Sequence, residues 1–242
     1  MQLFHGDCLE EMEKLPANSI DIVIADLPYG RFKHNEWDSP IDLERMWEQV
    51  WRVCKPSAPV LLFGDFRFAH ELLNSQPKLF RYEIVWDKEK STTPLLSQRR
   101  FGKCTEYILV FYKNPPLYNY KKYHKIIKTT REYFNCSYIG GKKIKKRANY
   151  YEPPLPLNTF RCPPPRMKKL ISSIPEKPQP LLEHLLKYFS NEGDTCLDFV
   201  MGSGSCGVAC QTLKRKFIGI ELKREHYVVA EKRLTPRCRT RP

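Results

Sequence analysis

Seven short apolar runs alternate with amphipathic helical patterns along most of this 242-residue chain, and this alternation constrains its fold more than any other feature. The runs are rich in β-branched and aromatic residues and have the length of buried strands. They cover Gln2–His5, Ile20–Ala25, Val60–Phe63, Tyr82–Trp86, Tyr107–Tyr112, Thr195–Phe199 and Phe217–Ile220. Strands that alternate with helices form a mostly parallel sheet with helices on both faces. The sequence therefore predicts an α/β fold with a doubly wound, Rossmann-like sheet.

Four helices are predicted between these strands from apolar residues at i, i+3 and i+4 spacing. They cover Ile41–Cys54, Pro180–Ser190, Ser205–Leu213 and Glu225–Leu234. The first is expected to have Ser39 as its N-cap and Pro40 as its first helical residue, because both residue types favour those positions.

One segment, residues 114–168, interrupts the alternation and carries most of the basic character of the chain. It holds 13 Lys or Arg against 2 Asp or Glu, a net +11 out of +14, together with 7 of the 13 tyrosines and 8 of the 20 prolines. Prolines are excluded from the middle of a sheet, so we expect a loop-rich insertion outside it. The basic charge indicates a polyanionic partner, although a solvated basic loop has the same composition. The cluster from Lys142 to Arg147 would also fit a nuclear-localisation patch. The predicted organisation is 1–113, 114–168 and 169–242, with the two outer parts forming one domain.

Other classes of protein are disfavoured. No apolar run approaches the roughly 20 residues that span a bilayer. The N-terminal residues Met1–Asp7 lack a basic start followed by an apolar stretch, so no signal peptide is expected. The nine cysteines lack paired metal-ligand spacing, so we expect reduced thiols, no metal site, and an intracellular, cytoplasmic protein.

A strand-turn-helix pattern near the C-terminus is typical of a nucleotide-binding site. The predicted strand Thr195–Phe199 runs into Met201-Gly-Ser-Gly-Ser205, where a predicted helix begins. Glycine lets the backbone approach a ligand closely, and a helix N-terminus presents free N–H groups. Glu221 ends the next predicted strand, where a carboxylate can accept both hydroxyls of a ribose. Nicotinamide and flavin enzymes share this pattern, so the motif alone leaves the cofactor open.

Asp26-Leu-Pro-Tyr29 follows the predicted strand Ile20–Ala25 and carries groups that can activate an exocyclic amine. The N6 amine of adenine is a weak nucleophile because its lone pair is delocalised into the ring. Acceptors on both of its N–H groups favour a tetrahedral nitrogen, and the Asp26 carboxylate and the Pro28 carbonyl can supply them. Tyr29 offers a flat face on which a base can stack. This chemistry requires neither a metal nor a covalent intermediate.

By itself, Asp26-Leu-Pro-Tyr29 is better explained as a turn that ends a strand. In a doubly wound sheet, however, ligands bind at the carboxyl ends of adjacent central strands. We expect Ile20–Ala25 and Thr195–Phe199 to be such neighbours, which would bring the two motifs together as one active site.

Taken together, these motifs resemble those of the permuted, beta-class amino-methyltransferases of DNA, in particular the small phage- and virus-type N6-adenine enzymes. In that class the catalytic motif comes first, then the target-recognition region, then the cofactor motif. Asp26-Leu-Pro-Tyr29 is similar to the Asp-Pro-Pro-Tyr of the family, and Glu106–Lys113 and Asn35–Asp38 are similar to stretches in its phage-type members. The resemblance covers nearly the whole chain. It implies a circularly permuted methyltransferase fold, S-adenosylmethionine as cofactor and double-stranded DNA as partner.

The resemblance also implies roles for individual residues. The catalytic residues would be Asp26, Pro28 and Tyr29. The cofactor-binding residues would be Asp7, Cys8, Lys177, Asp198, Phe199, Gly202, Ser203, Gly204, Ser205 and Glu221, with Asp7 on the adenine amine and Lys177 beside the methionine moiety. The DNA-binding candidates are Arg99, Arg100, Lys142, Lys143, Lys145, Lys146 and Arg147, since such side chains contact phosphates or bases. Trp37 is expected either to line the pocket for a flipped base or to pack in its loop.

Three departures from the family pattern stand out. Leu27 replaces the first proline of the catalytic motif, Cys206 stands where threonine is usual, and Pro175-Glu176 replaces Thr-Gln before Lys177. Asp26 itself favours adenine, because family members that act on cytosine N4 usually carry serine there.

The leading prediction is therefore a site-specific DNA adenine-N6 methyltransferase of a bacterium, a phage or a virus-infected host. Cytosine-N4 methylation in the same fold, a catalytically weak DNA-binding homologue, methylation of a protein glutamine or an RNA amine, and a nicotinamide oxidoreductase are the alternatives. The recognition sequence, a homodimer and an accompanying restriction endonuclease are left open by the sequence.

Overall fold

The computed structural model describes residues 1–30, 40–96, 98–135, 142–165 and 176–235, and the side chains of 130–149 lie outside that description. The chain forms two compact units. The larger unit is made of Met1–Leu117 and Asn158–Pro242, and the smaller unit is Tyr118–Leu157.

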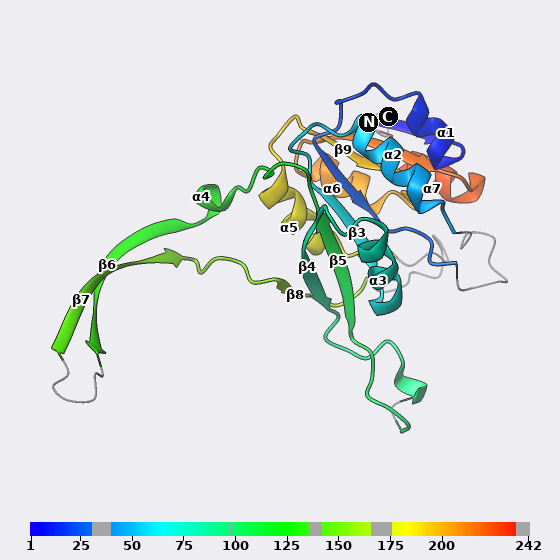
Figure 1. Cartoon of the computed structure of the whole chain (residues 1–242). Coiled ribbons are helices and arrows are strands. Elements are labelled where there is room, and N and C mark those ends of the chain that lie inside the picture. The colour runs from blue at the N-terminus through cyan, green and yellow to red at the C-terminus, as the bar shows by residue number, and fades with distance from the viewer. Residues whose placement is uncertain (31–39, 97, 136–141, 166–175, 236–242) are drawn as a thin grey trace, which may run out of the picture. The chain divides into compact units, whose positions relative to one another are not determined.

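A mixed sheet forms the centre of the larger unit, with the strand order β1-β10-β9-β2-β3-β5-β4-β8 (Figure 1). Its strands are β1 (Gln2–His5), β2 (Ile22–Ala25), β3 (Val60–Gly64), β4 (Phe80–Asp87), β5 (Thr105–Phe111), β8 (Thr159–Arg161), β9 (Thr195–Asp198) and β10 (Lys216–Glu221). The five strands from β1 to β3 in this order run parallel, whereas β5 runs antiparallel to both β3 and β4. All seven predicted strands are confirmed, and with them the α/β class.

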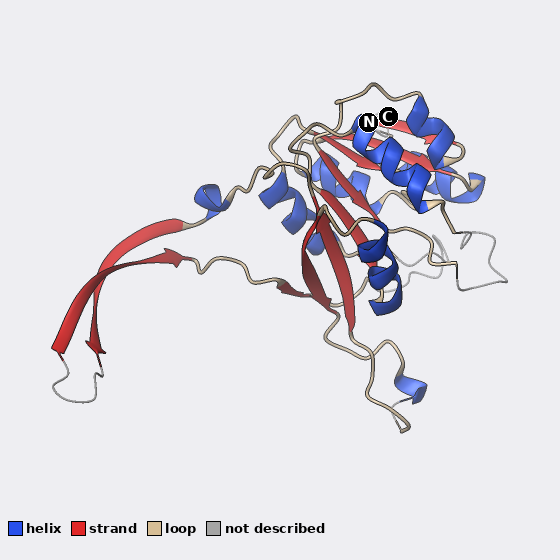
Figure 2. Cartoon of the chain, viewed as in Figure 1, coloured by secondary structure: helices blue, strands red, loops and turns tan. Residues whose placement is uncertain are grey.

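Helices cover both faces of this sheet (Figure 2). The helices of the larger unit are α1 (Cys8–Glu13), α2 (Leu43–Val53), α3 (Phe66–Ser75), α5 (Gln179–Phe189), α6 (Ser205–Thr212) and α7 (Arg224–Leu234). The apolar side chains of α1, α2 and α3 pack against the strand residues that point to one face of the sheet, such as Val23, Val60 and Leu109. The strand residues that point to the opposite face, such as Ile24 and Leu61, are also buried, because α5, α6 and α7 cover that face.

Aspartates begin three of the helices, and one of them corrects a prediction. The carboxylate of Asp42 accepts hydrogen bonds from the backbone N–H groups of Glu44 and Arg45 at 3.0 and 3.2 Å, so Asp42 is the N-cap of α2. The prediction of Ser39 as N-cap and Pro40 as first helical residue is wrong, because Asp caps as well as Ser and lies beside the first apolar residue of the helix. Ser39 itself lies outside the described residues.

The smaller unit consists mainly of a two-stranded antiparallel ribbon, whereas the sequence predicted loops. Strands β6 (Lys125–Asn135) and β7 (Lys142–Glu152) pair from Lys125↔Glu152 to Asn135↔Lys142. The loop-rich prediction is wrong for this stretch because β6 is rich in β-branched and aromatic residues, and the prolines of the segment lie before β6 or after β7 and not within either strand. The short helix α4 (Tyr120–Tyr123) precedes β6, and the Tyr120 ring contacts that of Tyr151 edge-on at 5.9 Å.

Part of the basic segment belongs to the larger unit. Strand β8, at 159–161, pairs in parallel with β4 from Val85↔Thr159 to Asp87↔Arg161. Among the described residues, no helix is both long and apolar enough to cross a membrane.

Candidate active site

The two motifs follow neighbouring strands, as predicted. Strand β2 pairs in parallel with β9, with Ile22 opposite Cys196 and Val23 opposite Leu197. The next strands along the sheet, β10 and β1, are also parallel to β9. Carboxyl ends of parallel strands meet at one edge of a sheet, so the residues that follow these four strands are brought together.

One cavity of about 540 Å³ lies at this edge. Its lining includes Asp7, Cys8, Asp26, Pro28, Tyr29, Lys177, Asp198, Phe199, Gly202, Ser203, Ser205 and Glu221, which are all but one of the predicted catalytic and cofactor-binding residues. Eight carboxylates and four lysine ammonium groups line it, so the cavity is acidic although the chain as a whole is strongly basic. A cavity of this volume and charge accommodates a small cationic ligand.

The glycine turn between β9 and α6 has the backbone conformation that requires glycine. Gly204 is the N-cap of α6 and has a left-handed φ of 79°. A Cβ at this position would lie 3.0 Å from Leu234 Cδ1 and 3.1 Å from Ala230 Cβ, which indicates close packing of the turn on α7. The predicted residue Gly204 thus shapes the turn, while Gly202 and Ser203 line the cavity.

A polar cluster behind the turn was not predicted from the sequence. The Ser203 hydroxyl donates to Glu176 Oε1 at 2.8 Å, and Arg233 Nη1 donates to the same oxygen at 2.7 Å. Arg233 also donates to the Ser203 carbonyl at 3.1 Å. Glu176, which departs from the family pattern, therefore anchors the turn through Ser203.

Glu221 links the end of β10 to the glycine turn. Its Oε2 accepts the Gly202 backbone N–H at 2.9 Å, and its Oε1 accepts the Lys223 backbone N–H at 2.9 Å. A carboxylate has about four lone pairs, so two remain for hydroxyl donors from a ligand in the cavity. His226 Nδ1 lies 3.5 Å from Oε1 and also lines the cavity.

The residues after β1 both cap a helix and line the cavity. Asp7 is the N-cap of α1 and accepts hydrogen bonds from the backbone N–H groups of Leu9 and Glu10 at 2.8 and 3.3 Å. Burial, together with the negative charge of Asp7, raises the pKa of the Cys8 thiol to about 12. Cys8 is therefore a neutral thiol at physiological pH.

Asp198 ends β9 as a buried carboxylate on the floor of the site. Its Oδ1 accepts the Val200 backbone N–H at 3.2 Å. Burial raises the pKa of Asp198 well above its usual range, and the charges of Asp26 and Glu221 add to that rise. A positive charge bound nearby would stabilise the ionised form of Asp198.

Asp26 lies at the end of a chain of charged side chains that the sequence did not predict. Lys177 Nζ lies 2.6 Å from Asp26 Oδ2 and 2.7 Å from Glu106 Oε1, and Lys88 Nζ lies 2.6 Å from Glu106 Oε2. Asp26 retains 33% exposure of its side chain, whereas Lys177 and Glu106 are nearly buried. Two lysines and two carboxylates thus neutralise one another on one side of the cavity.

The charges in this network set each other's protonation. Burial raises the pKa of Asp26, with Lys177 opposing the rise and Glu106 adding to it. Burial disfavours the charged form of Lys177, but Asp26 and Glu106 outweigh it and raise the pKa of Lys177 to about 12. Although burial opposes ionisation of Glu106, Lys177 and Lys88 lower its pKa. Asp26 therefore faces a permanent positive charge at neutral pH.

Lys177 lies in the cavity, as predicted, but its contacts are with these carboxylates. Its role beside the methionine moiety stays a prediction. Glu106 begins the stretch 106–113 that resembles phage-type enzymes, and a charged residue within a buried strand was the available signal for it.

The rest of the catalytic motif is held by packing. The Tyr29 hydroxyl donates to Asp26 Oδ1 at 3.2 Å, and its ring lies 4.8 Å from that of Phe68. Burial, and then the charge of Asp26, raises the pKa of Tyr29, so the phenol stays protonated. Leu27, which departs from the family motif, is only 2% exposed and packs in the core.

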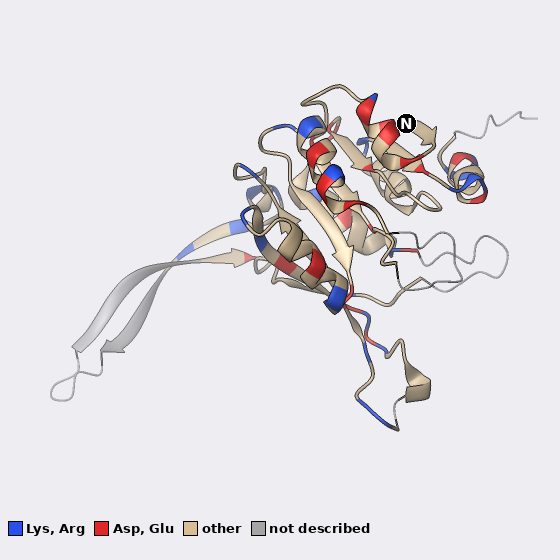
Figure 3. Cartoon of the chain, turned by 45° about the vertical axis from the view of Figure 1, so that its right-hand side comes forward, with Lys and Arg blue, Asp and Glu red and all other residues tan. Residues whose placement is uncertain are grey.

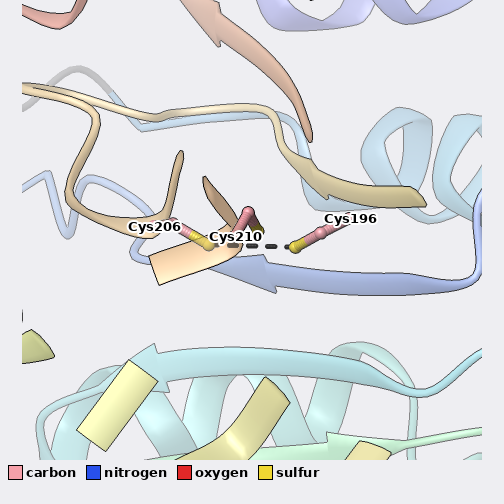
Figure 4. A group of neighbouring side chains, drawn as sticks. All are labelled: Cys196, Cys206 and Cys210. Atoms are coloured by element: carbon pink, nitrogen blue, oxygen red, sulfur yellow. Dashed lines mark hydrogen bonds between the residues drawn. The ribbon is translucent and has the colours of Figure 1, made fainter. Parts of the chain in front are cut away.

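Three cysteines meet behind the glycine turn. Cys196 of β9 and Cys206 and Cys210 of α6 are buried, and their sulfur atoms all lie within 4.8 Å of one another (Figure 4). The Sγ atoms of Cys196 and Cys206 are 3.8 Å apart, much longer than a disulfide bond. Cys206 therefore packs as a free thiol between the sheet and α6.

The predicted DNA-binding residues lie in two places. Arg99 and Arg100 are exposed in the loop between β4 and β5. Lys142, Lys143, Lys145, Lys146 and Arg147 lie on β7, with side chains outside the described part. Trp37 and Pro175 also lie outside the described residues, so their roles stay predictions.

A family model described as DNA methylase, of the N6 and N4 methyltransferases, matches residues 20–232 of the chain. The chain belongs to this family. This chain is 27% identical to the DNA adenine methyltransferase YhdJ of Escherichia coli strain K12 over 253 residues, which cover 96% of this chain and 82% of YhdJ. It is 28% identical to the type II methyltransferase M2.DpnII of Streptococcus pneumoniae over 263 residues, which cover 97% and 89% of the two chains.

Solved structures share the fold of the DNA methylase. The M1.HpyAVI–SAM complex is 25% identical with a TM-score of 0.62, and the match covers 97% of this chain and 98% of the other. The cytosine-N4-specific PvuII DNA methyltransferase is 16% identical with a TM-score of 0.70, and the match covers 98% and 86% of the two chains. At that identity, the second match shows the fold alone.

Proposed function

We propose that this DNA methylase transfers a methyl group from S-adenosylmethionine to the N6 amine of an adenine flipped out of double-stranded DNA. The observation that carries the proposal is the single cavity in which Asp26 follows β2 while the glycine turn and Glu221 follow β9 and β10. Amine-activating and nucleoside-binding groups thus face one space.

The described residues suit S-adenosylmethionine in charge and in donor set. The cofactor carries a sulfonium and an ammonium group, and the cavity lining is net acidic, with Asp198 buried where a nearby cation would stabilise it. Glu221 retains lone pairs for the ribose hydroxyls, and Asp7 and Cys8 line the part of the cavity next to it. When bound, the cofactor supplies a methyl group activated by its sulfonium charge.

The catalytic motif would prepare the amine. The Lys177 ammonium favours the ionised form of Asp26, and the second lone pair on each carboxylate oxygen is available to an N–H group of adenine. The Pro28 carbonyl would accept from the other N–H, and the Tyr29 ring lines the space for the base. Holding the amine beside the methyl donor converts the transfer into a step within one complex, so alignment contributes much of the acceleration.

Adenine is favoured over cytosine by Asp26, since cytosine-N4 enzymes of this class usually carry serine there, and by the name of YhdJ, a DNA adenine methyltransferase. A catalytically weak homologue is disfavoured because Leu27 is packed in the core rather than displacing Asp26 from the cavity.

The finer assignments are also part of the proposal. The catalytic motif precedes the cofactor motif, which supports the permuted class, and the basic segment 114–168 between them would recognise the target, with the basic residues of β7 on DNA phosphates. The name of M2.DpnII, a type II methyltransferase, supports a restriction-modification setting with a companion endonuclease. A phage or virus source and a homodimer rest on the resemblance alone.

The proposal is tested by the Asp26→Ala variant in two assays. Calorimetry should give cofactor affinity near that of the wild type, while transfer of label from S-adenosylmethionine to unmethylated plasmid DNA should be abolished. Methyl transfer by Asp26→Ala would contradict the role of Asp26. A wild-type chain that does not bind S-adenosylmethionine would contradict the proposed function.

A further inference from the structure

The loop between β4 and β5, residues 88–104, exposes apolar side chains beside arginines. Phe101 is fully exposed and Leu95 is 95% exposed, which is unusual for two large apolar residues of one loop. Arg99 and Arg100 lie between them in sequence, and neither makes a salt bridge with any residue that the structure describes. Five basic residues and one acidic residue occur in the loop, and basic residues are visible along it in Figure 3.

The base of the loop is fixed by hydrogen bonds. The Thr92 backbone N–H donates to the Lys103 carbonyl at 2.7 Å, and the Lys88 N–H donates to the Cys104 carbonyl at 2.7 Å. At Gly102, a Cβ would lie 2.3 Å from Ser91 Oγ, so the two sides of the loop approach closely there. These backbone hydrogen bonds therefore fix the part of the loop from which the exposed residues extend.

Local hydrogen bonds hold the described residues at the tip of the loop, which exclude Ser97. The N–H groups of Arg99 and Arg100 donate to the Leu96 carbonyl at 2.9 and 3.0 Å. The loop extends from the ends of β4 and β5 and carries a short helical turn, η2 (Pro94–Leu96) (Figure 1). Such order lowers the entropy lost when the tip binds a partner.

The loop begins and ends at the rim of the active site. Lys88 and Lys103, at its two ends, both line the cavity, and Lys103 Nζ lies 3.3 Å from Asp65 Oδ2. A duplex that delivers one base into the cavity would therefore lie close to this loop. That duplex has a gap in its stack where the base was, and an apolar side chain can fill it.

We propose that the loop 88–104 is a wedge that inserts Phe101, supported by Leu95, into the DNA stack while Arg99 and Arg100 contact the flanking phosphates. The inference rests on the proposed function, since it assumes that a base leaves the duplex. Exposed apolar side chains alone would equally suit a protein partner, but the adjacent arginines favour a polyanion. Stacking of an aromatic ring on bases is independent of sequence, so the wedge adds affinity for an opened duplex without specifying the site.

The wedge is tested by binding, independently of methyl transfer. The probes are a 30-base-pair duplex with one abasic site and the intact duplex, each titrated with the full-length chain. The wild type should prefer the abasic duplex by about tenfold, the scale of one base–aromatic stack. Phe101→Ala should bind both equally, Phe101→Trp should keep the preference, and Phe66→Ala, which removes a 70% exposed phenylalanine outside the loop, should also keep it.

Methyl transfer gives the second readout. Phe101→Ala should slow methylation of duplex plasmid DNA about tenfold but that of heat-denatured DNA by less than about twofold, because single strands need no flipping. An equal loss on both substrates, or equal binding of the two duplexes by the wild type, would overturn the wedge. A wild-type chain that prefers the abasic duplex but methylates neither DNA would instead overturn the proposed function. Self-association lost in Phe101→Ala, without any duplex preference, would show that the loop binds a second copy of the chain.

Discussion

Lys177 Nζ lies 2.6 Å from Asp26 Oδ2, across 151 residues of sequence, and its other partner is the buried Glu106. The carboxylate proposed to bind the adenine amine is therefore not isolated. Burial raises the pKa of Asp26, Lys177 opposes that rise by favouring the ionised form, and Glu106 adds to it.

Replacing Lys177 by Met should lower methyl transfer at neutral pH by about 100-fold, the scale of one lost electrostatic contact at a reacting centre. Without the ammonium, the pKa of Asp26 rises further, so the acid limb of the kcat/KM profile should move to higher pH. The variant should also lose about 3 kcal/mol in the free energy of unfolding, because two carboxylates are left together. An unchanged pH profile would show that Lys177 acts through the fold alone.

Replacing Glu106 by Gln should move the same acid limb in the opposite direction, to lower pH. The charge of Glu106 raises the pKa of Asp26, so its removal favours the ionised form. Opposite shifts in the two variants separate an electrostatic network from simple destabilisation, which would move neither limb.

Glu106 should also make stability sensitive to acid. Its pKa is lowered in the folded chain, so its contribution is present above the ordinary carboxyl value of about 4.5 and is lost as pH falls through the folded pKa. Lys177, with a pKa raised to about 12, contributes fully below its ordinary value of 10.5 and loses that contribution as pH rises through about 12. This is measured by denaturant unfolding at intervals of about one pH unit between about pH 3 and pH 7. As the pH falls, the free energy of unfolding should decrease less steeply for Glu106→Gln than for the wild type.

Many residues of this site lie at the ends of strands, and the ends of apolar runs can be located in a sequence. Asp26, Asp198 and Glu221 were predictable because each ends an apolar run, and parallel strands bring those ends together. The Lys177–Asp26 contact was not, since it joins residues far apart in sequence and depends on tertiary packing. The charge of Glu106 in an otherwise apolar strand was a signal for a functional residue, but charge alone does not show which partners the carboxylate has.

The basic segment shows the opposite error. Its prolines suggested loops, but β6 and β7 form a regular ribbon because strand propensity depends on the β-branched and aromatic residues between the charges. Composition identified the segment as distinct but did not give its structure.

Gly204 and Gly193 offer a matched pair for testing the glycine turn. Both have positive φ, but a Cβ at Gly204 meets Leu234 and Ala230, whereas at Gly193 nothing lies within 4 Å. Gly204→Ala should lower the free energy of unfolding by about 2–4 kcal/mol, and Gly193→Ala by only about 1 kcal/mol, the cost of the backbone conformation alone. Gly204→Ala should also weaken S-adenosylmethionine binding in calorimetry, which Gly193→Ala should not. Equal effects of the two variants would contradict a packed cofactor turn.

Glu221→Gln should raise the Kd for S-adenosylmethionine about 10- to 100-fold, because hydrogen bonds from hydroxyls to a carboxylate are stronger than those to an amide. The maximal rate at saturating cofactor should change little, since the proposed contact of Glu221 is with the ribose and not with the transferred methyl group. Glu183→Gln, a change in a carboxylate of α5 that pairs with Lys187, is the control and should bind normally. A fall in the maximal rate with unchanged affinity would argue against a ribose contact.

Methylation of adenine in DNA is tested most directly by nucleoside mass spectrometry of unmethylated DNA after incubation with the chain and S-adenosylmethionine. We expect N6-methyladenine with the wild type and none with Asp26→Ala. N4-methylcytosine in place of N6-methyladenine would keep the family and contradict the choice of base, and no methylated base from a chain that binds the cofactor would contradict the proposed activity on DNA.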